Sequence, residues 1–184
     1  MRKLKLHELG RKSVEEFIHT EKFPLRIILD DIRSGHNVGS VFRTSDAFLV
    51  DRVYLCGKTP APPHVEIYKT ALGAEDTIAW EKCASAVEAI ERCKHDGYTV
   101  IGLEQTTTSV KLHQVKFFAH SKYALLLGNE VNGVDETALS RCDQIIEIPQ
   151  LGTKHSLNVS VTAGIVLWAV FSQMIDRLEA KNQH

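Results

Sequence analysis

Apolar and polar positions recur along the chain with two different periods, and each period predicts a different kind of element. Short apolar runs rich in β-branched residues and bounded by Pro, Gly or Asp are typical of buried strands. Longer stretches whose apolar residues recur every three or four positions are typical of helices that pack on a sheet. The expected strands are 25–29, 52–56, 77–81, 98–103, 123–127 and 144–148. The expected helices are 6–19 (interrupted near Gly10), 38–48, 66–72, 85–97, 135–141 and 157–180.

The order of these elements predicts the fold class. Strands that alternate with helices are typical of an α/β domain with a mainly parallel sheet and helices on both faces. The expected strands are apolar at consecutive positions, as a sheet covered on both faces requires. The chain has no internal repeat and no linker, so we expect a basic N-terminal arm over residues 1–24 and one α/β domain over residues 25–184.

Composition excludes several classes of protein. A chain of 184 residues with 43% hydrophobic and 24% charged residues is typical of a globular domain and not of a disordered chain. No apolar run approaches the roughly 20 residues that a membrane helix needs, and the N-terminus lacks the apolar region of a secretory signal. Cysteines at positions 56, 83, 93 and 142 form no metal-binding spacing. We therefore expect a cytoplasmic protein with reduced cysteines, no metal and no membrane contact.

The net charge of −1 gives no sign of a strongly basic nucleic-acid-binding domain. The charge is nevertheless uneven, because residues 1–12 hold five Lys or Arg residues and one Glu. The rest of the chain holds 17 basic and 22 acidic residues. A short basic arm on an acidic body can place positive charge along a polyanion, although a solubilising tail explains the same pattern.

Candidate chemistry lies in three polar loops that contain glycine. In parallel sheets, ligands bind beyond the carboxyl ends of the strands, and the loops 30–39, 128–133 and 149–156 follow expected strands there. The phosphate-binding patterns GxGxxG and GxxxxGK[ST] and the nucleophile pattern GxSxG are all missing. A nucleotide or methyl-donor site in these loops would have to be of another kind.

The first loop offers a helix start and a cation. Asn37 is expected to cap the helix that begins at Val38, and Gly39 allows another backbone segment to come close. Arg43 follows about one turn later, where its guanidinium suits a phosphate through two parallel hydrogen bonds. A capping Asn with a surface ion pair would account for the same residues.

The other two loops offer a carboxylate and a second helix start. Glu130 ends an apolar strand, and Gly128 before it could let a cofactor lie against bare backbone. Ser156 is expected to cap the last helix, whose first turns hold Asn158 and several small residues. A tight turn and a closely packed helix explain these features equally well.

Taken together, the three loops resemble the three motifs of the SpoU/TrmH family of RNA ribose 2′-O-methyltransferases, within the SPOUT class. The first motif corresponds to Asn37-x-Gly39-x-x-x-Arg43. The second corresponds to Leu127-Gly128-Asn129-Glu130 with Gly133. The third runs from Ile148-Pro149 to Ser156-Leu157-Asn158-Val159-Ser160. The order and the intervals agree, and the resemblance covers about residues 25 to 175.

The resemblance implies a fold, a cofactor and a reaction. It implies that the C-terminal part of the α/β domain forms a deep trefoil knot, that the protein is a homodimer, and that S-adenosylmethionine donates a methyl group to a ribose 2′-hydroxyl of RNA. The implied catalytic residues are Arg43, Asn37, Glu130, Ser156 and Asn158. The implied cofactor-binding residues are Leu103, Gly128, Ile148 and Leu157, mostly through their backbone. The pKa of an arginine, above about 12, makes an orienting role for Arg43 on a phosphate more reasonable than a role as base.

The sequence leaves open which RNA is the substrate and what the C-terminal tail contacts. About 24 residues precede the first expected strand, which leaves no room for the N-terminal RNA-binding domain of many relatives and favours tRNA over rRNA. The tail, residues 172–184, is a candidate for dimer or RNA contact. One alternative is a non-catalytic RNA-binding or ribosome-assembly protein on the same fold, which the complete set of motif residues argues against. Another is a nucleotide-dependent enzyme with a doubly wound sheet, which the missing phosphate loops argue against.

Overall fold

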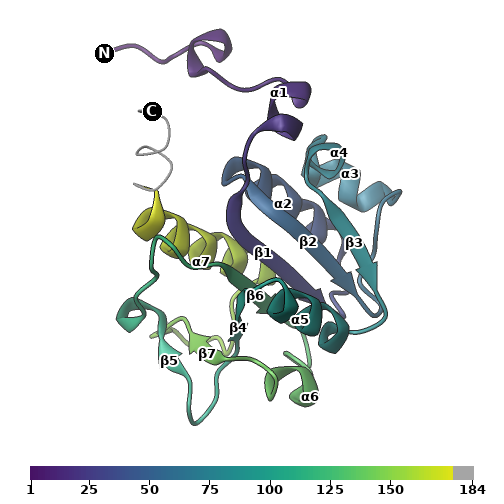
Figure 1. The fold of residues 1–184 in the computed structure, drawn as a ribbon, viewed down its shortest axis with the longest axis vertical. Coiled ribbons are helices and arrows are strands. Elements are labelled where there is room, and N and C mark those ends of the chain that lie inside the picture. The colour runs from purple at the N-terminus through teal and green to yellow at the C-terminus, as the bar shows by residue number, and fades with distance from the viewer. Residues whose placement is uncertain (176–184) are drawn as a thin grey trace.

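One parallel sheet organises the molecule (Figure 1). The structure, a computed structural model, describes residues 1–175 without the side chains of residues 6 and 7. Within that part of the chain, seven strands pair in the order β3-β2-β1-β6-β4-β7-β5, and every pairing is parallel. The strands are β1 (Phe23–Asp30), β2 (Val50–Cys56), β3 (Trp80–Cys83), β4 (Thr99–Leu103), β5 (Val110–Lys111), β6 (Tyr123–Leu127) and β7 (Gln144–Glu147). The predicted α/β class and parallel sheet are confirmed.

Helices cover both faces of this sheet (Figure 1). The α-helices are α1 (Val14–His19), α2 (Gly35–Ala47), α3 (Val65–Ala71), α4 (Ala74–Thr77), α5 (Ala86–His95), α6 (Glu136–Leu139) and α7 (Val159–Met174). Two short 3₁₀ helices, η1 (Leu6–Leu9) and η2 (Leu112–Gln114), complete the set. The end of the predicted last helix and most of the tail lie outside the described residues. Within residues 1–175, no helix has both the length and the apolar character needed to cross a bilayer.

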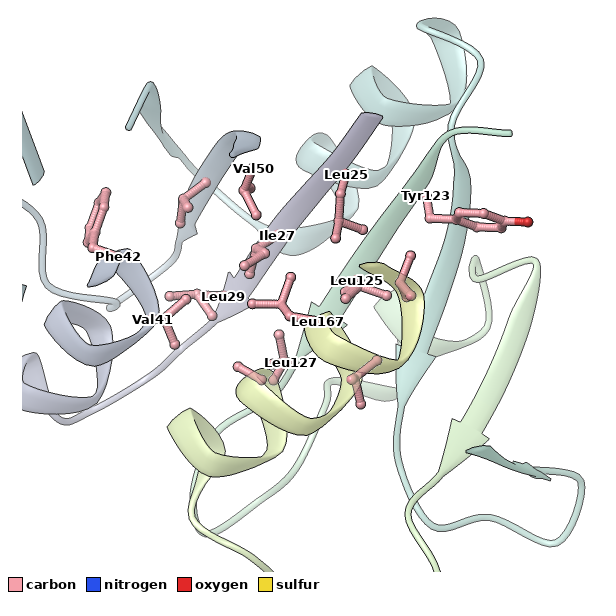
Figure 2. Packing of buried hydrophobic residues seen from close by; sticks show 14 of the residues in the cluster. Leu25, Ile27, Leu29, Val41, Phe42, Val50, Tyr123, Leu125, Leu127 and Leu167 are labelled. Carbon is pink, nitrogen blue, oxygen red and sulfur yellow. The ribbon is translucent and has the colours of Figure 1, made fainter. Parts of the chain in front are cut away.

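Alternate side chains of the central strands build two separate cores. Leu25, Ile27 and Leu29 of β1 are fully buried on the face that α2 and α7 cover. Figure 2 shows Leu167 of α7 packed over this face. Ile28 points the other way, into a second cluster that contains residues of α5 and α6. Because side chains alternate across a strand, a strand buried on both faces must be apolar at consecutive positions, as β1 and β6 are.

One predicted strand boundary was wrong, and one strand was missed, both at the sheet edges. The strand expected over 77–81 is β3 at Trp80–Cys83, because Ala74–Thr77 form the short helix α4. This edge strand is only half-buried and reads Trp-Glu-Lys-Cys, so it has no apolar run to mark it. The two-residue strand β5 at the other edge was missed for the same reason. The predicted trefoil knot is not tested by the sheet order and stays a prediction.

The strand order makes the connections after β1 and β6 diverge. The chain leaves β1 through α2, which packs on one face of the sheet, and leaves β6 toward α6 on the other face. Connections that diverge from neighbouring parallel strands open a crevice beyond their carboxyl ends, where ligands bind in doubly wound sheets. The loops that follow β1 and β6 are two of the three loops that the sequence singled out.

Gly39→Ala tests the packing of α2 on α3, and Gly164→Ala on α7 serves as a comparison. A Cβ atom at Gly39 would lie 2.2 Å from Thr70 Oγ1 and 2.4 Å from the Ile67 carbonyl oxygen. Gly39→Ala should therefore lower the free energy of unfolding by about 1–3 kcal/mol, because α3 must move. A Cβ atom at Gly164, in the middle of α7, meets nothing within 4 Å. Gly164→Ala should raise the free energy of unfolding by about 0.5–1 kcal/mol through helix propensity.

Urea unfolding of both variants in one buffer measures this difference. A Gly39→Ala protein as stable as the wild type would contradict the close approach of the two helices.

Candidate active site

A cleft of about 590 Å³ opens beyond the carboxyl ends of β4, β6 and β7. Its size lies within the range of small-molecule sites, about 300–1,000 Å³. The walls come from the three loops that follow these strands and from the start of α7. The apolar lining residues include Leu103, Leu127, Ile146, Ile148, Leu157 and Val166, and the polar ones include Glu104, Gln105, Asn129, Glu130, Glu147, His155, Ser156 and Asn158.

Glu130 joins the loop after β6 to the loop after β1. Its carboxylate accepts hydrogen bonds from the backbone N–H groups of Arg33 at 2.9 Å and Ser34 at 3.2 Å. The side-chain amide of Asn37 donates a third at 3.0 Å. Partial burial opposes ionisation of the Glu130 carboxyl, but the hydrogen bonds from Arg33 and Asn37 outweigh it, so the pKa lies below its ordinary value. The carboxylate is therefore ionised and saturated with donors.

Asn37 extends this connection to the third loop. Asn158 Nδ2 donates to Asn37 Oδ1 at 3.0 Å, while Asn37 Nδ2 donates to Glu130. Both ends of the Asn37 amide are thus engaged, which fixes its orientation. Asn158 Oδ1 in turn accepts from the backbone N–H of Ser160 at 2.8 Å and so caps α7. Three residues that are far apart in the sequence, Glu130, Asn37 and Asn158, form one continuous hydrogen-bonded chain, which we call the loop-tying chain.

The structure corrects both predicted helix caps. Ser34, rather than Asn37, caps α2, because its side chain accepts from the backbone N–H of Asn37 at 3.3 Å. Asn158, rather than Ser156, caps α7. In each case two residues of capping type lie within three positions of each other. Asn37 cannot serve as the cap because its amide already contacts Glu130 and Asn158.

A closed turn shapes the wall of the cleft after β6. The backbone groups of Asn129 and Gly133 bond to each other in both directions at 2.9 Å. A Cβ atom at Gly128 would lie 2.3 Å from the backbone of Gly133 and Val134. Gly128 is therefore required by the turn itself, whereas the sequence suggested that it leaves room for a ligand. Asn129 also ties the turn to the first loop, since its Nδ2 donates to the Asp31 carbonyl oxygen at 2.6 Å.

The loop after β4 forms a wall that the sequence did not reveal. Glu104 accepts from the backbone N–H of Val134 at 3.1 Å, and Gln105 Nε2 donates to the His155 carbonyl oxygen at 3.0 Å. These bonds join the β4 loop to the loops after β6 and β7. The available signal was a polar run, Glu-Gln-Thr-Thr-Thr-Ser, directly after an apolar strand. The run contains no glycine, so it was not among the polar, glycine-containing loops that the sequence singled out.

The predicted site residues divide into three groups. Leu103, Gly128, Ile148 and Leu157, the four predicted cofactor contacts, all line the cleft. Glu130, Asn158 and Ser156 line it as well. Asn37 lies behind them in the loop-tying chain.

Arg43 stands apart from the cleft. It is exposed on α2, is not among the lining residues, and makes no hydrogen bond or ion pair with any residue that the structure describes. Its guanidinium is thus free to take a ligand from solvent. Across residues 1–175 no group of three or more His, Cys, Asp and Glu side chains could hold a metal ion.

Comparison with known families matches this architecture. The family model described as the SpoU rRNA Methylase family matches residues 24–168, which is most of the chain. The chain belongs to the SpoU family. The match includes all three loops and the start of α7, so the predicted family is confirmed. A curated relative from Neisseria meningitidis, named 23S rRNA (guanosine-2'-O-)-methyltransferase RlmB, is 33% identical over 144 residues. That match takes in 78% of this chain but only 56% of the relative.

Solved SpoU structures share the fold. The TrmH/SpoU tRNA modifying enzyme of A. aeolicus superposes with a TM-score of 0.78 at 25% identity, over 89% of this chain and 82% of that enzyme. An AdoMet-bound rRNA methyltransferase from Sinorhizobium meliloti superposes with a TM-score of 0.75 at 26% identity, over 84% of this chain and 58% of that enzyme. The predicted fold class therefore has close structural counterparts.

Glu130→Gln tests the loop-tying chain by its dependence on pH. An amide keeps one acceptor oxygen but loses the charge and the second acceptor, so we expect a stability loss of about 1 kcal/mol at pH 7 for this partly exposed group. The pKa of Glu130 is lowered by folding, so its stabilising effect is complete above the ordinary value of 4.5 and is lost as the pH falls through the lowered pKa. The difference between wild type and variant should therefore shrink toward pH 3.

Thermal melting from pH 3 to pH 7 measures this difference. Glu15→Gln removes the same charge from an exposed position on α1 and should change stability little at any pH. A stability gap for Glu130→Gln that does not change with pH would argue against the ionised form as the hydrogen-bond acceptor.

Proposed function

We propose that this protein is an S-adenosylmethionine-dependent RNA methyltransferase that modifies a ribose 2′-hydroxyl. The observation that carries this proposal is the loop-tying chain, which holds three SpoU motifs around one cleft lined by all four expected cofactor contacts. The name of the N. meningitidis relative describes a 2′-O-methyltransferase, and the S. meliloti structure is an AdoMet-bound enzyme. These names support the cofactor and the reaction.

The residues of the cleft fit the chemistry of this cofactor. Glu104, Glu130 and Glu147 line it, and none of the lining residues that the structure describes is a Lys or Arg. A negative lining suits the sulfonium and ammonium groups of S-adenosylmethionine, and the apolar wall around Leu103 and Ile148 suits its adenine ring. When bound, the cofactor supplies an electrophilic methyl group that needs no metal for activation.

The chain's own residues then bind and position the substrate. Glu130, Asn37 and Asn158 act as positioning residues, since their polar groups are used on one another and on backbone N–H groups. Ser156 at the cleft wall has a hydroxyl available for the ribose. Arg43 holds the phosphate beside the reactive ribose and so orients the 2′-hydroxyl, whose proton passes to solvent. Positioning of this kind supplies much of the catalysis when the methyl donor is already reactive.

Two classes of RNA, tRNA and ribosomal RNA, are candidate substrates. The A. aeolicus structure is a tRNA modifying enzyme. The curated relatives named RlmB modify 23S rRNA, and their names shift our proposal toward ribosomal RNA. The decisive experiment maps 2′-O-methylation in rRNA and tRNA from cells with and without the gene. A site that is lost on deletion and restored by the wild type, but not by Arg43→Ala, would identify both reaction and substrate.

Loss of no methylated site in either RNA would favour the alternative, a non-catalytic RNA-binding or ribosome-assembly protein on this fold. The basic arm remains a proposed RNA contact in both cases. Its Arg2 is paired with Glu8, and its Lys22 donates to backbone carbonyl oxygens, which leaves Lys3, Arg11 and Lys12 for phosphates. We assign the reaction to the cytoplasm, where the four free cysteines stay reduced.

Arg43→Lys separates the charge of Arg43 from its shape. Lysine keeps the positive charge but loses the planar fork that binds a phosphate through two hydrogen bonds. We expect turnover to fall about tenfold or more, equivalent to about 1.4 kcal/mol or more, with unchanged affinity for S-adenosylhomocysteine. Single-turnover methylation and calorimetry measure the two quantities. Arg141→Gln removes an exposed cation far from the cleft as a control, and wild-type turnover by Arg43→Lys would refute a role for the fork.

We also propose that the protein is a homodimer that buries the outer face of α7. Val161, Ile165 and Trp168 are 50%, 38% and 57% exposed and form one apolar stripe along this helix. The Trp168 ring rests on Phe48 of the neighbouring segment, which extends the stripe beyond α7. A surface of this kind is typical of an interface between subunits.

Trp168→Glu tests the dimer. A carboxylate in an apolar interface should convert the dimer to a monomer, which light scattering coupled to size-exclusion chromatography detects. Val65→Glu introduces the same charge at another exposed apolar position, on α3, and should leave the mass unchanged. A wild-type protein that elutes as a monomer at micromolar concentration would refute the proposed dimer.

A further inference from the structure

Basic side chains have different partners at the two ends of the strands. Near the ends where the strands begin, five arginines and lysines pair with carboxylates, whereas Lys22 and Lys122 donate to backbone carbonyl oxygens. The pairs there are Arg26 with Asp51 and Asp96, Arg52 with Glu81, Arg92 with Glu81 and Glu88, Lys94 with Asp143, and Arg141 with Glu91. At the edge where β1 and β2 end, Arg33, Lys58 and Lys69 are exposed. Among the residues that the structure describes, none of these three side chains has a hydrogen-bond or ion-pair partner.

The segments that carry these three cations form one surface. The backbone N–H of Lys58 donates to Asp31 Oδ1 at 2.7 Å, which joins the loop after β2 to the loop after β1. The backbone N–H of Ile32 next to Arg33 donates to Thr59 Oγ1 at 3.0 Å. Thr70 Oγ1, adjacent to Lys69, donates to the carbonyl oxygen of His36 at 2.8 Å. The three cations therefore lie along the joined loops and α3, and we call them the basic strip.

The acidic residues of the same segments accept hydrogen bonds from backbone N–H groups and do not pair with the three cations. Asp31 accepts from the Lys58 backbone, and Glu66 accepts from the backbone N–H of Gly35 at 3.2 Å. Glu130, across the cleft edge, accepts from the backbone of Arg33 and Ser34. Each carboxylate satisfies backbone donors at the start of α2 or in the loop before α3. Within the described residues, none of these carboxylates forms an ion pair with Arg33, Lys58 or Lys69, so the three cationic groups are free to contact an anion.

We propose that Arg33, Lys58 and Lys69 bind successive phosphates of the substrate RNA and guide it to the cleft. The inference rests on the proposed function for the identity of the polyanion. The basic strip reaches the site directly, because the backbone of Arg33 contacts Glu130, a residue of the cleft wall. Unpaired cations beside a site attract a polyanion and raise its local concentration.

An aromatic side chain beside the strip favours RNA over other polyanions. Tyr68 precedes Lys69 on α3, and the residue is 43% exposed. Exposed aromatic rings next to basic residues stack on unpaired bases, a contact that a simple anionic polymer cannot make. The strip thus offers both phosphate-binding and base-stacking groups on one surface.

The experiment compares two triple variants that remove equal charge. Arg33→Gln, Lys58→Gln and Lys69→Gln together remove the basic strip. Arg92→Gln, Lys94→Gln and Arg141→Gln together remove paired cations from the opposite edge. Binding of the full chain to unmodified 23S rRNA and tRNA transcripts is measured by filter binding over a series of salt concentrations. Calorimetry with S-adenosylhomocysteine reports the cleft separately.

We expect the strip variant to bind RNA at least tenfold more weakly at about 0.1 M salt, with the slope of log K against log salt reduced by about 2–3. The opposite-edge variant should bind within about twofold of the wild type, since its cations are already neutralised by carboxylates. Both variants should bind S-adenosylhomocysteine as the wild type does. Each single variant, Lys58→Gln and Lys69→Gln, should reduce the slope by about 0.7–0.9, which keeps the test valid if the triple variant folds poorly.

Several results would overturn the inference. Equal losses in the two triple variants would mean that only overall charge matters. Wild-type RNA binding by the strip variant, with methylation intact, would refute the basic strip and leave the proposed function standing. A change in the oligomeric state of the strip variant would identify this surface as an interface between copies of the chain. A wild-type protein that binds neither RNA would refute the proposed function and the strip together.

Discussion

The hydrogen-bonded chain of Glu130, Asn37 and Asn158 is the constraint on which the rest of the site depends. The loops after β1, β6 and β7 are irregular, so their backbone donors cannot be satisfied by sheet or helix bonds. The Glu130 carboxylate accepts hydrogen bonds from two of these donors in the first loop. The Asn158 side chain accepts from a free backbone N–H in the first turn of α7. Asn37 connects the two, and its amide cannot turn over because both of its ends are engaged. The shape of the cleft follows from this arrangement, since Asn158 fixes where α7 begins and Glu130 fixes where α2 begins.

This arrangement separates the residues that build the site from those that are left for a ligand. A carboxylate that already accepts three hydrogen bonds and has a lowered pKa is a poor proton acceptor, so Glu130 is suited to architecture rather than to base catalysis. Asn37 and Asn158 have also used their polar groups. The side chains of Ser156 and Arg43 make no such contacts within the described residues. A site of this kind is suited to orienting reactants, which agrees with the proposed use of a methyl donor that is reactive by itself.

The sequence predicted the parts of the molecule that follow from local pattern. The central strands have consecutive apolar residues because both of their faces are buried, and that pattern is visible without a structure. The edge strands β3 and β5 have no such run and were misplaced or missed. The caps of α2 and α7 were assigned to the wrong one of two nearby polar residues. Asn37 bonds to Glu130, more than 90 residues away, and Asn158 bonds to Asn37, more than 120 residues away, so neither contact is visible in the local sequence. The wall formed by Glu104 and Gln105 was missed for a similar reason, as its role is set by contacts with Val134 and His155.

The partners that each carboxylate meets also explain why a net charge of −1 is a poor guide to what the protein binds. Carboxylates that satisfy backbone donors still count in the net charge, yet they do not occupy the hydrogen-bond donors of the cations beside them. Asp31, Glu66 and Glu130 are used in this way around the start of α2, and the side chains of the basic strip have no ion-pair partner among the described residues. At the opposite edge, the carboxylates near α5 face arginines and lysines and cancel them. Which cations are free to meet a phosphate therefore depends on which donors each carboxylate meets, and the carboxylates that join the loops around the start of α2 leave Arg33, Lys58 and Lys69 available.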